Sequence, residues 1–156
     1  QMRVELTTNK CLTGTDRLYE VALKRKADFY INIQGDEPLI SSKDIKIIIE
    51  AAQKEPNITF NAMCLIKDED DFRNPNIPKV VTRNDGRLLY MSRAPVPTNK
   101  QHGFANAMKQ VCIYVYPRDV LVAFGSLKEK TPCLKPLIFD SLNDENRFLI
   151  SVNTPV

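Results

Sequence analysis

Short apolar runs alternate along the chain with segments in which apolar residues recur at helical spacing. The run Phe29–Ile33 is continuous, aromatic and β-branched, and it breaks at Gly35 and Pro38. This pattern is typical of a buried strand that ends in a sharp turn, and we expect a central strand of a sheet here. The segments 15–26 and 42–55 on either side have apolar residues three and four positions apart, which predicts helices.

The second half of the chain contains more strand-like runs and fewer helices. Residues 79–83 and 87–91 flank a turn that contains Gly86, which predicts a β-hairpin. The other predicted elements are a strand over 59–66, a polar loop over 67–78, a loop from 93 to about 108, a strand over 110–116, a helix opening at Pro117 and a last strand over 148–152. Residues 126–147 give no clear pattern because prolines interrupt them.

Alternation of strands and helices, followed by a hairpin, predicts an α/β fold with three layers and a mixed sheet. We interpret residues 1–156 as a single domain. We expect the sequence to be truncated at both its N-terminus and its C-terminus. The chain opens directly before a strand-like segment, and it closes on Thr154-Pro155, which is a typical helix start.

Composition narrows the function classes. The 156 residues are 43% hydrophobic and 26% charged, which is ordinary for a globular domain. A net charge of +3 without a basic stripe does not favour nucleic-acid binding, and no apolar run predicts membrane insertion or a signal peptide. Four dispersed cysteines and the single His102 do not favour a zinc site. We expect three of these cysteines to be buried thiols and the protein to be cytoplasmic.

The turn after the run Phe29–Ile33 carries the first candidate for chemistry. In open α/β sheets, ligands bind outside the carboxyl ends of the strands, so Asp36 is expected to face a ligand. The alternative is that Asp36 only fills a turn position, as acids commonly do.

Five segments together carry a resemblance to a known family. They are Thr13-Gly14-Thr15-Asp16-Arg17; Gln34-Gly35-Asp36-Glu37-Pro38; Asn74-Pro75-Asn76 before Lys79-Val80-Val81; Leu89-Tyr90-Met91-Ser92-Arg93-Ala94 with Pro97; and Cys112-Ile113-Tyr114 with Tyr116. In this order they resemble the CMP-Kdo synthetases, the 3-deoxy-manno-octulosonate cytidylyltransferases. The resemblance covers about residues 3–128 and 152–155, and it implies a Rossmann-like nucleotidyltransferase domain with a hairpin insertion.

The resemblance implies transfer of a cytidylyl group from CTP to a sugar acid such as Kdo, with Mg²⁺, for cell-surface polysaccharide synthesis. It also implies a homodimer. Asp36 is then a catalytic residue and a metal ligand, because a hard carboxylate suits Mg²⁺. Asn153 stands where the family usually has a second acid, and its uncharged amide would weaken metal binding. The alternative for Asn153 is a simple turn residue.

The same resemblance assigns two groups of binding residues. The nucleotide group is Thr13, Gly14 and Arg17, and the substrate group is Gln34, Arg93, Gln110 and Tyr114. Arg93 is also expected to be catalytic, since its planar guanidinium suits a carboxylate. Three alternatives stay open: a helix cap followed by a solvated Arg17, a surface ion pair for Arg93, and a core position for Tyr114.

Other functions remain open. The enzyme alternative is a cytidylyltransferase for another acid, such as a nonulosonate or a phosphonate. The non-enzyme alternative is a fragment that only binds nucleotide or dimerises, because the family's N-terminal unit, which binds the triphosphate, is absent from this sequence. Residues 129–151 also lack the Leu- and Glu-rich helix that the family has there, so no role is carried over to them.

Overall fold

The computed structural model describes residues 4–35, 40–104, 106–127, 142–144 and 147–152. The helices are α1 (Gly14–Lys24), α2 (Ser42–Lys54), α3 (Glu69–Arg73) and α4 (Arg118–Ser126). The strands are β1 (Phe29–Ile33), β2 (Thr59–Leu65), β3 (Lys79–Thr82), β4 (Leu88–Ser92), β5 (Met108–Pro117), β6 (Leu142–Asp144) and β7 (Arg147–Val152).

Local sequence explains where the two long N-terminal helices begin. Thr13 caps α1 and Asp16 bonds back to the cap backbone; Ser41 and Asp44 do the same for α2. Each pair forms a reciprocal capping box, which satisfies backbone N–H groups that would otherwise lack a partner. Both helices therefore start within a residue or two of where the sequence places them.

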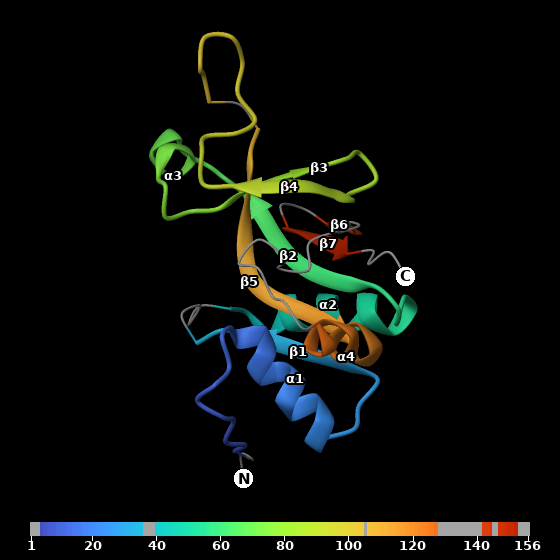
Figure 1. The fold of residues 1–156 in the computed structure, drawn as a ribbon. Helices are drawn as coiled ribbons and strands as arrows, with labels where there is room; N and C mark the ends of the chain where they lie inside the picture. The colour runs from blue at the N-terminus through green and yellow to red at the C-terminus, as the bar shows by residue number, and fades with distance from the viewer. Residues whose placement is uncertain (1–3, 36–39, 105, 128–141, 145–146, 153–156) are drawn as a thin grey trace.

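The helices cover the two faces of one sheet, which gives the predicted three layers (Figure 1). On one face, Ile48 and its neighbours on α2 pack against Phe60 and Val115. On the other face, Ala22 of α1 and Leu121 of α4 pack against tyrosines of β1 and β5. Alternation along the strands sends successive side chains to opposite faces, so both faces acquire an apolar core.

The sheet differs from the prediction in two respects. Its order is β4-β3-β5-β2-β7-β6, with β1 paired to β5, and all pairs between described strands are antiparallel rather than mixed. In the described part of the chain β1 pairs with β5 alone, so the expected central position is wrong there. An apolar strand tolerates this position because helices, rather than further strands, cover both its faces.

Other expectations are corrected by tertiary context. The predicted loop 67–78 contains the short helix α3, which Asp68 caps through the Asp71 N–H. Cys11, Cys64 and Cys112 are half-buried rather than fully buried, and Cys133 lies outside the described residues. Cys11 precedes α1, Cys64 lies beyond the part of β2 packed on α2, and Cys112 lies at an irregularity of β5. None of the described helices is long and apolar enough to cross a membrane.

Candidate functional site

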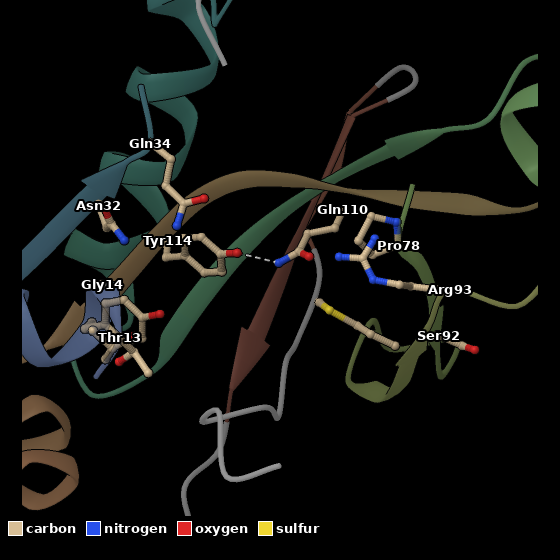
Figure 2. Close-up of a pocket in the computed structure, with 12 residues that line it drawn as sticks. Thr13, Gly14, Asn32, Gln34, Pro78, Ser92, Arg93, Gln110 and Tyr114 are labelled. Carbon is tan, nitrogen blue, oxygen red and sulfur yellow. Dashed lines mark hydrogen bonds between the residues drawn. The ribbon is translucent and has the colours of Figure 1, made fainter. Parts of the chain in front are cut away.

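A hollow of about 300 Å³ lies on the sheet face that carries α1, between the start of that helix and the hairpin β3–β4 (Figure 2). Tyr114 lies in the middle of it, with Gln34 and Gly14 on one side and Gln110 and Arg93 on the other (Figure 2). The residues that line it are Thr13, Gly14, Thr15, Asn32, Gln34, Pro78, Met91, Ser92, Arg93, Gln110, Tyr114 and Tyr116.

The start of α1 forms one wall of this pocket. Thr13 Oγ1 donates to Asp16 Oδ2 over 2.9 Å and accepts from the Asp16 N–H over 3.2 Å, so the Thr13 side chain is engaged in capping. Gly14 has no side chain, and the space beside its Cα atom is open, since a Cβ atom built there would meet no heavy atom within 4 Å. This wall can therefore approach a flat ligand closely through its main chain.

Side-chain amides form the opposite wall. Gln110 Nε2 donates to Tyr114 Oη over 2.6 Å and to Asn61 Oδ1 over 3.1 Å. Asn61 is fully buried, and its own Nδ2 donates to the Val111 and Ile113 carbonyls over 2.8 Å each. Gln110 thus rests on a buried, hydrogen-bonded support.

Arg93 reaches the pocket from the end of β4. Its Nη1 donates to the carbonyls of Pro75 and Asn76 over 2.9 and 3.1 Å. From the other side the fully buried Lys79 Nζ donates to the carbonyls of Asn74, Ile77 and Arg93 itself over 2.7, 2.8 and 3.3 Å. Two cations therefore hold residues 74–77 and fix the backbone of Arg93.

Burial changes the pKa of two groups near the pocket. Desolvation, together with the nearby Arg93, lowers the pKa of the Lys79 ammonium, and Asp71 partly offsets this. Desolvation raises the pKa of Tyr116 to about 12, against a hydrogen bond with Thr15 that lowers it. The Tyr114 and Tyr116 rings stack with centroids 6.0 Å apart, so the floor of the pocket is aromatic.

The structure brings together six of the predicted site residues: Thr13, Gly14, Gln34, Arg93, Gln110 and Tyr114. Arg17 does not line the pocket; it is exposed and its Nη1 donates to Thr7 Oγ1 and the Thr8 carbonyl over 2.7 and 3.3 Å. In this structure α1 turns the Arg17 side chain toward the N-terminal segment, and its assignment to the nucleotide stays a prediction from the sequence. Asp36 and Asn153 lie outside the described residues.

Several lining residues were missed by sequence reasoning. Asn32 could have been found, because alternation along β1 places it on the same face as Tyr30. Ser92 and Met91 lie in a quoted motif but gave no chemical signal. Thr15 and Tyr116 also lie in these motifs and were not assigned a role, whereas Pro78 lies outside them.

The lining carries amides, hydroxyls, one guanidinium and aromatic rings, which suits a polar, anionic ligand with hydroxyl groups. None of these described lining residues is a carboxylate. Within the described residues no group of three or more His, Cys, Asp or Glu side chains could hold a metal ion. The predicted Mg²⁺ site on Asp36 and Asn153 therefore stays a prediction from the sequence.

Comparisons with known proteins agree in pointing to one family. The family model described as cytidylyltransferase matches residues 1–145. The chain is similar to the 3-deoxy-manno-octulosonate cytidylyltransferases of Escherichia coli (37% identity, 81% of this chain, 52% of the relative) and Geobacter metallireducens (40%, 80% and 54%). It is also similar to the solved structure of CMP:2-keto-3-deoxy-manno-octonic acid synthetase complexed with CTP. That similarity has a TM-score of 0.71 and 37% identity, and it covers 81% of this chain and 52% of that one. The chain thus spans about half the length of these relatives.

Proposed function

Because the chain belongs to the cytidylyltransferase family, we propose that the complete protein transfers a cytidylyl group from CTP to a sugar acid such as Kdo and releases pyrophosphate. One observation carries the proposal. Two of the three residues assigned to the nucleotide and all four assigned to the sugar acid line one hollow. The relatives named for the Kdo reaction at 37–40% identity support the choice of acceptor.

The proposed division of the pocket follows its chemistry. The backbone of Thr13 and Gly14 approaches the nucleotide, while Arg93 binds the acceptor carboxylate and the amides of Gln34 and Gln110 bind its hydroxyls. Holding donor and acceptor in one hollow converts a bimolecular reaction into an effectively unimolecular one. Bound Mg²⁺ would supply charge neutralisation on the phosphates, and Asp36 and Asn153 are the proposed ligands.

Two further elements of the proposal concern the whole protein. We propose that it works as a homodimer and serves cell-surface polysaccharide synthesis. For the dimer, the loop between β4 and β5 is long for a compact domain, and long loops are usually functional or bound to a partner.

A coupled assay of pyrophosphate release tests the function directly. The complete protein is incubated with Mg²⁺, with CTP or UTP, and with a panel comprising Kdo, a nonulosonate and a phosphonate. We expect turnover with CTP and Kdo, and a clear preference for CTP over UTP in kcat/KM. Equal kcat/KM for CTP and UTP would contradict the nucleotide assignment. Turnover with a nonulosonate or a phosphonate but not with Kdo would mean that this other acid is the acceptor. No turnover at all would favour a protein that only binds nucleotide or dimerises.

Replacing Arg93 with lysine should raise KM for the sugar acid about tenfold, which corresponds to about 1.4 kcal/mol. The substitution keeps the positive charge but loses the planar fork, which at present also holds the Pro75 and Asn76 carbonyls. KM for CTP should change little. Steady-state kinetics with each substrate varied in turn measures both values.

Arg83→Lys is the matched control, since Arg83 lies in the hairpin turn, pairs with Asp85 over 3.2 Å and does not line the pocket. If Arg93→Lys instead raises KM for CTP and leaves that for the sugar acid unchanged, Arg93 belongs to the nucleotide side.

A further inference from the structure

We propose that Asn61, a buried residue outside the pocket lining, positions the Gln110 carboxamide so that its oxygen is presented to the ligand. This part of the pocket would then select a hydrogen-bond donor, a hydroxyl or a protonated amine, over an ether, carbonyl or carboxylate oxygen. The inference rests on the proposed function only for the identity of the ligand as a sugar acid.

The orientation of Asn61 is set where β2 meets β5. The register of this pair shifts between Asn61 and Ala62, so the regular ladder is interrupted there. Asn61 Nδ2 donates to the Val111 and Ile113 carbonyls, at 2.8 Å each, in place of the interrupted backbone bonds. Because both acceptors are backbone carbonyls, the orientation of the Asn61 amide is fixed and its Oδ1 must point the other way.

That orientation is passed on to Gln110. Asn61 Oδ1 is only an acceptor, so the group facing it over 3.1 Å has to be the donor end of the Gln110 amide, Nε2. The second Nε2 hydrogen is directed to Tyr114 Oη over 2.6 Å (Figure 2). Both donor hydrogens of Gln110 are thus used within the protein, and the reverse orientation would leave two oxygens in contact.

What remains for a ligand is the Gln110 oxygen. Among the described residues no donor reaches Gln110 Oε1, and Gln110 lines the pocket. An acceptor fixed in this way rejects ligand groups that can only accept, because two facing acceptors leave both without a partner. Sequence reasoning could not find Asn61, since it lies about 50 residues from Gln110 along the chain.

Hydrogen exchange of the wild-type side chain tests the orientation without any substrate. In the ¹⁵N-labelled complete protein, both Nε2 hydrogens of Gln110 should exchange at least about tenfold more slowly than those of the exposed Gln53 and Gln101, because both are hydrogen-bonded. Loss of the signals in Gln110→Leu assigns them. One Nε2 hydrogen that exchanges as fast as those of Gln101 would overturn the proposed orientation.

A double-mutant cycle tests the positioning role. Asn61→Leu should raise KM for the sugar acid about tenfold with little change for CTP, whereas in a Gln110→Leu background the same change should have no further effect on that KM. Phe60→Leu controls for general damage to β2, since Phe60 is equally buried but packs against α2, and it should leave both KM values unchanged.

An equal rise of both KM values in Asn61→Leu, or a full further effect in the Gln110→Leu background, would show that Asn61 is merely structural. If the wild-type protein turns over no sugar acid, the proposed function fails, while the exchange experiment still decides the orientation. If Asn61→Leu does not fold, that experiment on the wild type decides alone.

Discussion

Turnover of the complete protein should fall on the order of 10²–10³-fold when Asp36 is replaced by alanine. Asp36 follows β1 by three residues and Gln34, which lines the pocket, by two. Phosphoryl-type transfer depends on neutralising charge on the phosphates, and the described pocket lining supplies one guanidinium but no carboxylate for a metal ion. Asp36 is therefore the residue on which the proposed Mg²⁺ dependence rests.

The measurement is kcat from pyrophosphate release at saturating CTP and sugar acid, over a range of Mg²⁺ concentrations. Asp36→Asn should shift half-maximal activity to higher Mg²⁺, since an amide oxygen binds the ion without charge. Asp85→Ala is the matched control, because this exposed acid lies in the hairpin turn and pairs only with Arg83 among the ion pairs of the described residues. Near-normal turnover of Asp36→Ala would remove Asp36 from the site.

The free energy of unfolding should fall by about 2–4 kcal/mol in Lys79→Met. Charge-assisted hydrogen bonds contribute about 1.5–3 kcal/mol each, and the cost of burying the ammonium, which methionine avoids, offsets part of their sum. Lys79 is fully buried and its ammonium donates to three backbone carbonyls. Methionine fills a similar volume but donates nothing, so the carbonyls of Asn74, Ile77 and Arg93 lose a partner. Denaturant unfolding of the complete protein measures the change.

The pH dependence of this effect has a definite sign. Burial and Arg93 lower the pKa of Lys79 in the folded protein from 10.5. Between the lowered pKa and 10.5 the unfolded chain binds more protons than the folded one, so the contribution of Lys79 to stability rises with pH there. The difference between wild type and Lys79→Met should therefore widen toward pH 10.5.

Lys46→Met is the control for Lys79, because Lys46 is exposed on α2 and surface substitutions usually stay within about 0.5 kcal/mol. Equal stability of Lys79→Met and the wild type would mean that the carbonyls find other partners. A further readout is KM for the sugar acid. It should rise in Lys79→Met, since Lys79 holds the backbone of Arg93.

Features set by neighbouring residues could be read from the sequence. The capping pairs Thr13/Asp16 and Ser41/Asp44 start their helices wherever those residues stand, because the hydrogen bonds span only three positions. Gly86 adopts a φ of 82°, which glycine tolerates without a steric cost, so the hairpin turn was also predictable. Most of the residues that line the pocket lie in the family motifs.

Only the tertiary structure decided how those elements meet. An apolar run such as Phe29–Ile33 has the same pattern at the centre of a sheet and under helices at its edge, and the pairing with β5 alone placed it at the edge of the described sheet. Arg17 is of a residue type that often binds nucleotides, but the orientation of α1 directs its side chain away from the pocket. Asn61 and Lys79 act through carbonyls that folding brings within 2.7–3.3 Å, and no spacing along the chain encodes those contacts.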